Sequence, residues 1–301
     1  MTSEPASADP VSADGAAPGV GGWPELPDPL PVPITDSHCH LNTVYDAERF
    51  GAGLTVSAAL AHAKAVGVTR LVQVGYDLDS SRWGAAIATE HPEVVAAVAL
   101  HPNEAPRLAA SGDLGQAFDE IAALARNDPA DRIRAIGETG LDHFRTGPEG
   151  RAAQEESFRR HIDLAKQLDR TLVIHDRDAH DDVVRVLTTE SPPDRVVFHC
   201  FSGDAELARI CNERGWFMSF AGPVTFKANE SLREALRVAH ESLILVETDA
   251  PFLTPLPHRG RPNASYLLPL TLRHVADTRG VDVESAARGV ALATERAFGR
   301  W

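Results

Sequence analysis

Eight short apolar runs alternate with longer amphipathic stretches from Ile34 to the end of the chain. The runs predict strands at 34–38, 70–75, 94–100, 133–138, 171–175, 195–199, 215–220 and 243–248. The stretches between them predict helices at 53–66, 80–91, 114–125, 150–168, 179–190, 204–214, 231–240 and 283–298. Strands that alternate with helices of ten or more residues are typical of parallel βαβ units. Eight such units predict an α/β fold, a closed (β/α)8 TIM barrel, as a single domain over residues 34–301.

The length of the chain agrees with one barrel and an N-terminal tail. The chain has 301 residues, and a (β/α)8 barrel commonly takes about 250. Residues 1–33 are rich in Ala, Pro, Gly, Ser and Asp and lack apolar periodicity, which predicts a disordered acidic tail. Neither GxGxxG nor a GxxxxGK motif followed by Ser or Thr comes after a predicted strand, so we expect no nucleotide cofactor.

The sequence also predicts a cellular compartment. It has no apolar run of about 18 residues, so we expect no membrane contact. The first ten residues, MTSEPASADP, lack the basic and apolar regions of a secretion signal. The cysteines Cys39, Cys200 and Cys211 are odd in number and form no CxxC pair, which favours a reducing cytoplasm over a disulfide framework. The oligomeric state is left open.

Side chains that bind metals stand at the carboxyl ends of several predicted strands. They are His38, His40, Glu138, His175, His199 and Asp249. A parallel barrel brings all its strand carboxyl ends to one face, so residues that are distant in the sequence meet there. Imidazoles and carboxylates together suit one or two divalent cations. The pattern therefore predicts a metal-dependent hydrolase.

The alternation of side chains along the strands supports this interpretation. His38 and His40 are two positions apart and therefore face the same way, into the mouth of the barrel. Each carboxylate oxygen of Glu138 can take one ion, which predicts a residue that bridges two metals. Glu247 shares a face with Asp249 but lies deeper, where it would orient a ligand histidine. A buried structural ion pair is the alternative for Glu247.

Four further residues are candidates for substrate binding: His101, Arg177, Lys227 and Arg259. His101 follows the third predicted strand, and the three cations lie on loops after strands, where they would hold phosphate oxygens. A solvated surface charge is the alternative for each cation. The formal net charge of −14 argues against a basic groove for duplex DNA. It leaves open a strand end that enters a metal site, because bound cations are often the largest local charges.

Six motifs together resemble the TatD family of metal-dependent deoxyribonucleases, within the amidohydrolase-like barrels. They are DSHCHLN (36–42), LHP (100–102), GETGLD (137–142), IHDR (174–177), FHCFSG (198–203) and ETDAPFLTP (247–255). The resemblance covers about residues 34–298. It implies a (β/α)8 barrel with two divalent cations, Mg, Mn or Zn, held by the six candidate ligands. It also implies hydrolysis of DNA phosphodiesters, often as an exonuclease at 3′ ends.

Two features depart from the family pattern. Asn263-Ala264-Ser265 stands where the family usually has Asn-Glu-Pro. Four acidic residues follow His175, and these would either repel a polyanion or face solvent: Asp176, Asp178, Asp181 and Asp182.

We therefore expect a metal-dependent hydrolase of ester bonds, a deoxyribonuclease that acts on a DNA strand end. A water held by the cations would attack phosphorus, with Asp249 as its proton acceptor and Glu138 as the shared ligand. One alternative is a barrel with the same ligands that hydrolyses a small ester, lactone or amide, because the fold does not determine the substrate. Another is a barrel that binds metal or nucleic acid without turnover.

Overall fold

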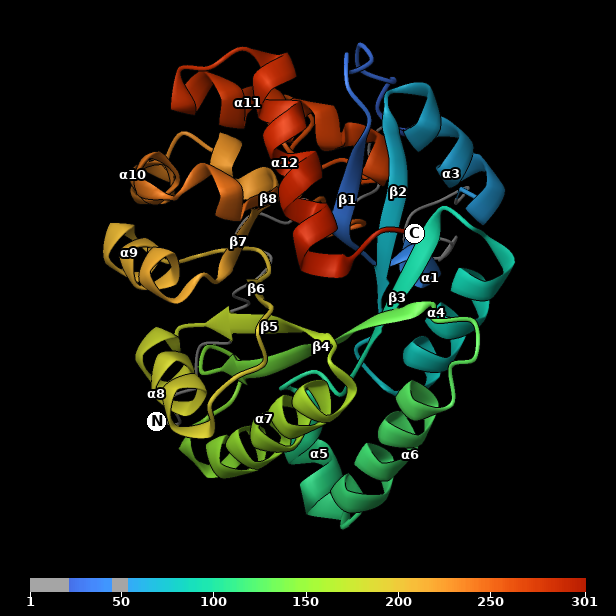
Figure 1. Cartoon of the computed structure of the whole chain (residues 1–301), viewed down its shortest axis with the longest axis vertical. Coiled ribbons are helices and arrows are strands. Elements are labelled where there is room, and N and C mark those ends of the chain that lie inside the picture. The colour runs from blue at the N-terminus through green and yellow to red at the C-terminus, as the bar shows by residue number, and fades with distance from the viewer. Residues whose placement is uncertain (1–21, 45–53) are drawn as a thin grey trace, which may run out of the picture.

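The computed structural model of this chain describes residues 22–44 and 54–301. Its eight strands pair in parallel in the order β1 to β8, and the helices lie outside them (Figure 1). The strands are β1 (Ile34–Cys39), β2 (Val68–Val74), β3 (Val94–Val98), β4 (Ile133–Asp142), β5 (Thr171–Arg177), β6 (Val196–Phe198), β7 (Phe217–Phe220) and β8 (Ile244–Val246). All eight lie in predicted runs or overlap them. The predicted (β/α)8 barrel is confirmed.

Helices connect the strands on the outside of the barrel. They are α1 (Leu41–Val44), α3 (Val56–Ala65), α4 (Leu78–Glu90), α5 (Glu104–Ser111), α6 (Leu114–Arg126), α7 (Pro148–Leu168), α8 (His180–Glu190), α9 (Ala205–Arg214), α10 (Glu230–Val238), α11 (Leu268–Arg279) and α12 (Val283–Phe298), with short 3-10 turns η2 (Gly222–Thr225), η3 (Glu241–Leu243) and η4 (Ser265–Leu267). Helices α1, α5 and α11 were not predicted. Both α5 and α11 carry a proline near their first turn, where its missing N–H and fixed φ are compatible with a helix. None of the described helices is long and apolar enough to cross a membrane.

The strands are buried on both faces, as expected for a parallel sheet between a filled interior and a layer of helices. Every residue of β3 is buried, and its sequence VVAAV has no polar position. One face of each strand fills the barrel and the other packs under the helices. The histidines and carboxylates of the predicted site stand at or just after the carboxyl ends, which is where barrels of this kind form their sites.

A buried carboxylate joins the first strand to the segment that follows the last. Asp36 of β1 accepts hydrogen bonds from the backbone N–H and the hydroxyl of Thr248, at 2.9 and 2.6 Å, although the two residues are 212 positions apart. Burial raises the pKa of Asp36 to about 6, and the hydrogen bonds from Thr248 oppose that rise. Two backbone hydrogen bonds complete the junction, from Asp249 N to His38 O (2.9 Å) and from His40 N to Ala250 O (2.8 Å). The barrel closes at this point.

The described part of the N-terminal segment packs on the barrel. Tyr266 donates its hydroxyl hydrogen to the carbonyl of Pro24 at 2.7 Å, and Leu30 N donates to Val66 O at 3.0 Å. Leu30 is buried, and Trp23 packs against the core. The predicted disorder is therefore wrong for residues 22–33, because these apolar side chains and backbone hydrogen bonds attach them to the barrel. Residues 1–21 lie outside the described residues, so the tail predicted there stays a prediction.

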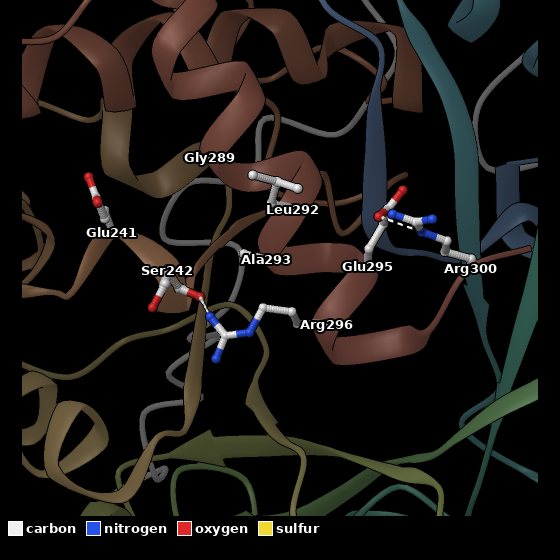
Figure 2. Close-up of a pocket in the computed structure, with 8 residues that line it drawn as sticks. All are labelled: Glu241, Ser242, Gly289, Leu292, Ala293, Glu295, Arg296 and Arg300. Carbon is white, nitrogen blue, oxygen red and sulfur yellow. Dashed lines mark hydrogen bonds and ion pairs between the residues drawn. The ribbon is translucent and has the colours of Figure 1, made fainter.

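A hollow of about 600 Å³ lies at the amino-terminal end of the barrel (Figure 2). It is bordered by η3, which precedes β8, and by α12 and the residues after it. Its lining residues are Glu241, Ser242, Gly289, Leu292, Ala293, Glu295, Arg296 and Arg300. None of the predicted ligands borders it. Barrel enzymes carry their active sites at the opposite, carboxyl-terminal face, so we do not place the functional site in this hollow.

A buried histidine ties α7 to the end of β3. His161 is fully buried, and its Nε2 accepts a hydrogen bond from Leu100 N at 3.2 Å. Its Nδ1 donates to Ser157 O at 2.7 Å, so the neutral ring uses both nitrogens. Burial lowers the pKa of His161 to about 4. Protonation would remove the acceptor for Leu100 N and leave a charge in the core.

We predict that His161 makes the protein less stable in mild acid. The pKa of a histidine in the unfolded chain is about 6.5. As the pH falls, the unfolded chain therefore binds this proton before the folded protein does. Stability is lost as the pH falls from that value towards about 4. The loss is about 2 kcal/mol at a pH of about 5. Urea unfolding measures the free energy of unfolding at about pH 7.5 and pH 5. The decrease between the two pH values should be smaller in His161→Gln than in wild type, by roughly that amount.

His91→Gln, a change at a partly exposed histidine, is the control. An equal pH dependence in wild type and His161→Gln would contradict this role.

Candidate metal centre

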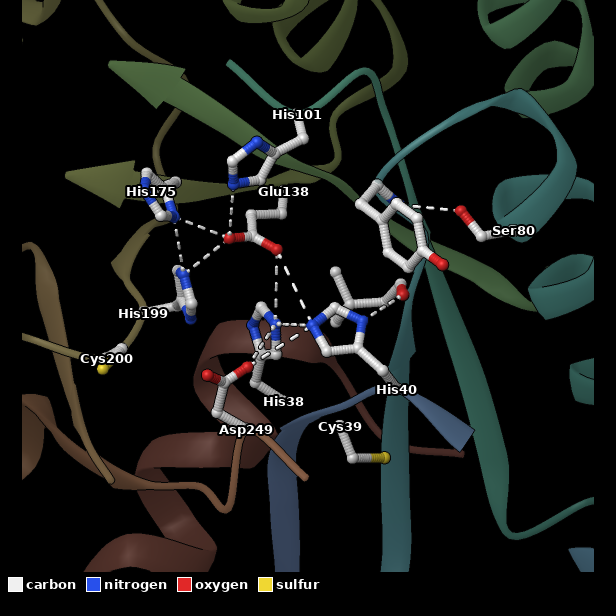
Figure 3. A network of polar contacts seen from close by, with 12 residues as sticks. His38, Cys39, His40, Ser80, His101, Glu138, His175, His199, Cys200 and Asp249 are labelled. Carbon is white, nitrogen blue, oxygen red and sulfur yellow. Dashed lines mark hydrogen bonds and ion pairs between the residues drawn. The ribbon is translucent and has the colours of Figure 1, made fainter. Parts of the chain in front are cut away.

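The six predicted ligands meet at the carboxyl end of the barrel (Figure 3). His38 belongs to β1, Glu138 to β4 and His175 to β5. The other three, His40, His199 and Asp249, lie just after β1, β6 and β8. We call these six residues the ligand cluster. They come together because parallel strands place their carboxyl ends on one face and because the Asp36 junction brings β1 beside β8.

One half of the cluster has the spacing of donors around a single ion. His38 Nε2 and His40 Nε2 are 3.2 Å apart. Asp249 Oδ1 lies 3.4 Å from His40 Nε2 and 3.7 Å from His38 Nε2. Glu138 Oε2 lies 3.6 and 3.8 Å from the same two nitrogens. Donors held at about 2.0–2.1 Å from a tetrahedral ion are about 3.3 Å apart, so these four atoms fit a divalent cation.

The other oxygen of Glu138 faces a second group of donors. Glu138 Oε1 lies 2.7 Å from His175 Nδ1, 2.9 Å from His199 Nε2 and 3.4 Å from His101 Nε2. The two ring nitrogens of His175 and His199 are 3.4 Å apart. Glu138 therefore stands between two groups of nitrogens and directs one oxygen to each, which is the position that a bridging carboxylate needs.

Close approach of β4 to β5 places Glu138 in the middle. The pairing of these strands is irregular between Ile136 and Thr139. Gly140 has a φ of +139°, and a Cβ at this position would collide with the carbonyl oxygen of His175. Only glycine combines that backbone conformation with that contact. The glycines of GETG are thus required for the geometry around Glu138.

Hydrogen bonds from the far side of the rings orient two of the histidines. His40 Nδ1 donates to Val74 O at 2.9 Å, which leaves Nε2 as the lone-pair nitrogen towards the cluster. Glu247 Oε1 lies 3.3 Å from His199 Nδ1 and accepts the backbone N–H of Cys200 at 2.6 Å. Glu247 thus lies where the sequence predicts it, behind a candidate ligand histidine. Such partners set the tautomer and the orientation of metal-binding imidazoles.

Electrostatics in the cluster favour the metal-binding charge state for His38 and Glu138, whereas nearby carboxylates stabilise the protonated rings of His40, His175 and His199. Burial, followed by the nearby His199, lowers the pKa of His38 well below its usual value, so the ring is neutral. Burial alone would raise the pKa of Glu138, but His199 and His101 outweigh it and hold that pKa well below its usual value. Neutral imidazoles and ionised carboxylates are the forms that ligate cations. Burial opposes but does not cancel the effect of the carboxylates, which raise the pKa values of His40 and His175 and hold that of His199 well above its usual value. A bound cation would take the place of those protons, and the residue types of the cluster, imidazole and carboxylate, fit divalent metals.

The predicted substrate residues differ in their distance from the cluster. His101 lies against it, since the centroid of its ring is 4.5 Å from that of His175. Arg177 ends β5, and its guanidinium lies 4.0 Å from the centroid of the Phe144 ring. Arg259 lies 4.6 Å from the ring centroid of Phe226. Lys227 is exposed between η2 and α10, and no recorded contact among the described residues joins its side chain to the cluster.

Sequence reasoning missed one residue of the site. Asp142 is the last residue of β4, beyond the predicted end of that strand. Its Oδ2 lies 3.2 Å from His175 Nε2 and accepts a hydrogen bond from Asn103 Nδ2 at 3.0 Å. The signal was available, because Asp142 is four positions from Glu138 on the same strand and therefore shares its face.

Two segments depart from the family pattern. In the first, Asn263 keeps the family residue; it is buried and donates to Thr248 O at 2.9 Å, so it holds the segment after β8. Ala264 and Ser265, which stand in place of Glu and Pro, are also buried. Asp176 lies 2.7 Å from His180 Nδ1, and Asp182 accepts a hydrogen bond from Arg185 at 3.0 Å. These two carboxylates are turned to cationic or polar partners, while Asp178 and Asp181 are exposed. The acidic run therefore presents less free charge to the mouth than its composition suggests.

The chain is similar to known proteins over nearly all of the barrel. A family model described as TatD related DNase matches residues 35–299. The chain is 41% identical over 272 residues to the "uncharacterized metal-dependent hydrolase TatD" of Mycobacterium tuberculosis, a match that covers 88% of this chain and 98% of that protein. It is 34% identical over 267 residues to the "uncharacterized metal-dependent hydrolase YabD" of Bacillus subtilis, a match that covers 88% of this chain and 97% of that protein.

A crystal structure has the same fold. The structure of YjjV, a TatD homologue from Escherichia coli, superposes with a TM-score of 0.80 at 22% identity. The superposition covers 89% of this chain and 98% of that one.

We predict that Asp142 strengthens metal binding through His175. In Asp142→Asn the amide is a weaker partner for the His175 ring, and cation affinity should fall by about 10- to 100-fold. Calorimetric titration of the metal-free protein with Mn or Zn measures this loss. Glu104→Gln, which alters an exposed pair with Arg107, should leave the affinity unchanged. Equal affinity in Asp142→Asn and wild type would show that Asp142 is structural only.

Proposed function

Because this chain belongs to the TatD related DNase family and is a metal-dependent hydrolase of that family, we propose that it hydrolyses phosphodiester bonds of DNA. The proposed substrate is a strand end, and the proposed direction is exonucleolytic, from the 3′ end. One observation supports this most directly: Glu138 directs one oxygen to the His38 and His40 side and the other to the His175 and His199 side. Paired cations joined by a carboxylate are common in enzymes that cleave phosphodiesters.

We infer that the ligand cluster holds two divalent cations. His38, His40 and Asp249 would hold one, His175 and His199 the other, and Glu138 would be shared. Mg, Mn and Zn are all candidates, because sites of imidazole and carboxylate accept several ions. When bound, the cations would lower the pKa of a water and neutralise charge on the phosphoryl oxygens.

The residues of the chain have separate tasks in this reaction. Asp249 Oδ1 faces the two histidines of β1, and its other oxygen would accept the proton of the attacking water. The new bond joins the water oxygen to phosphorus, and the bond from phosphorus to the leaving oxygen breaks. His101, beside Glu138, would bind a non-bridging oxygen of the phosphoryl group that is attacked. Arg177, at the end of β5, would bind phosphate oxygens of the strand. The burial of the cluster keeps bulk water from screening these charges.

An acidic surface supports one alternative substrate class. The formal net charge is −14, which disfavours long polyanions and favours a small ester, lactone or amide. The same cluster would serve that chemistry, because barrels change substrates through their loops. A panel of single-stranded DNA with a free 3′ end, circular single-stranded DNA, a lactone and a carboxylic ester separates the two. Faster turnover of the lactone or ester than of DNA would support the alternative.

We predict that loss of either central carboxylate abolishes catalysis by different routes. Asp249→Asn removes the proton acceptor and a charged ligand of one cation, and should lower kcat by about 10²- to 10⁴-fold. Glu138→Gln removes the ligand shared by both cations and should lose more bound metal than Asp249→Asn. Release of nucleotides from a labelled oligonucleotide, with and without a chelator, measures the rate. Elemental analysis measures the metal.

Glu241→Gln, in the hollow at the opposite end of the barrel (Figure 2), is the matched control and should retain activity. DNA cleavage that persists in purified Glu138→Gln, or that a chelator does not affect, would reject the assigned roles.

A further inference from the structure

A phenylalanine and an arginine form a pair beside the ligand cluster. Arg177 is the last residue of β5, two positions beyond His175, so both side chains leave the strand on the same side. Its guanidinium carbon lies 4.0 Å from the centroid of the Phe144 ring. This is the distance of a cation–π contact. We call these two residues the Phe144–Arg177 pair.

The backbone places the pair at a defined position relative to the cluster. Asp142 and Arg177 are partners in the register of β4 and β5. His143 N donates to Arg177 O at 2.9 Å. The Asp142 carboxylate accepts Arg145 N at 2.8 Å, so it closes the turn that carries Phe144. The other oxygen of Asp142 reaches His175, and the turn is therefore linked to a candidate metal ligand.

The ring of Phe144 is partly exposed on the turn that follows β4. Phe144 is 37% exposed. Among the described residues, the other large hydrophobic side chains that are exposed, Leu26, Val281 and Leu292, are all aliphatic. The Arg177 guanidinium lies over one face of the Phe144 ring. The exposed area of the ring therefore lies away from the face that Arg177 covers. Exposed apolar surface near a site is a common feature of ligand contacts.

The charge of Arg177 has no ionic partner among the residues that the structure describes. The chain has 43 acidic and 29 basic residues, and most of its described arginines lie near a carboxylate or a backbone carbonyl. Arg177 instead contacts only the Phe144 ring through its guanidinium. Its hydrogen-bond donors are therefore available to an anion, and a guanidinium binds phosphate oxygens with a defined geometry.

We propose that the Phe144–Arg177 pair is a nucleotide subsite in which Arg177 binds a phosphate next to the scissile bond and Phe144 stacks on the adjacent base. This inference rests on the proposed function, which it deepens by naming the substrate as an unpaired strand end. A base within a duplex is already stacked on its neighbours, whereas an unpaired base has a free face. Stacking on an aromatic ring accepts any base, so the subsite selects for an unpaired end and not for a sequence.

The experiment compares Phe144→Ala, Phe144→Tyr and wild type on two matched oligonucleotides. One carries ordinary nucleotides at its 3′ end and the other carries abasic residues there. Loss of one stacked base corresponds to a fall of roughly 5- to 150-fold in kcat/KM. We expect that fall in Phe144→Ala on the ordinary end only, with the change mainly in KM. Phe144→Tyr should retain the wild-type value.

A second readout detects the subsite without cleavage. The fluorescence of a terminal 2-aminopurine falls when the base stacks, and wild type should quench it on binding while Phe144→Ala does not. Leu292→Ala, at another exposed hydrophobic residue far from the cluster, is the control and should quench normally. Arg177→Met should weaken binding to both oligonucleotides and reduce the salt dependence by about one charge.

The outcomes separate this inference from the proposed function. An equal fall in kcat/KM on ordinary and abasic ends would reject Phe144 as a base contact and indicate a structural role. Quenching by wild type that is unchanged in Phe144→Ala would reject the subsite as well. Quenching that depends on Phe144, in a wild-type protein that does not cleave DNA, would reject the proposed function and leave the subsite intact.

Discussion

The hydrogen bonds between Asp36 and Thr248 are the constraint on which the site depends. The first strand and the segment after the last strand share few backbone hydrogen bonds, and a buried carboxylate completes their junction. His38 and His40 stand on one side of this junction and Asp249 on the other. Their donor atoms come within 3.4 to 3.7 Å because the junction determines the distance between the two backbones. A carboxylate buried without these donors would cost several kcal/mol, so the hydrogen bonds from Thr248 offset the cost of burying Asp36 at the junction.

Much of the fold and the candidate site was predictable from the sequence, for a physical reason. A strand in a parallel barrel is buried on both faces, so it appears as an apolar run, and its first polar residues mark its carboxyl end. The period of two then assigns faces, which placed His38, Glu138 and His175 together. The same rule applies to Asp142, but the predicted strand ended at residue 138, so the contact of Asp142 with His175 was not predicted.

Other features depend on distances that no local pattern contains. The division of the cluster into two groups requires the side-chain position of Glu138, which the close contact of Gly140 with β5 determines. Residues 22–33 have a composition typical of disorder, yet Leu30 is buried in the structure. Their order comes from contacts with α11 and η4, which lie more than 200 positions later. Composition does not predict this order, because the hydrogen bonds and the burial that offset the lost chain entropy exist only once the barrel has folded.

The course of the N-terminal segment has a practical consequence. Arg261, on the loop after β8, donates to the carbonyl of Gly22 at 3.1 Å, whereas the indole of Trp301 donates to Glu93 O just before β3 begins. The two ends of the described chain are therefore near opposite openings of the cylinder. A fusion partner or surface linker joined after Trp301 would leave the catalytic opening facing solution. One joined directly before Gly22 would start beside that opening and hinder the approach of large molecules.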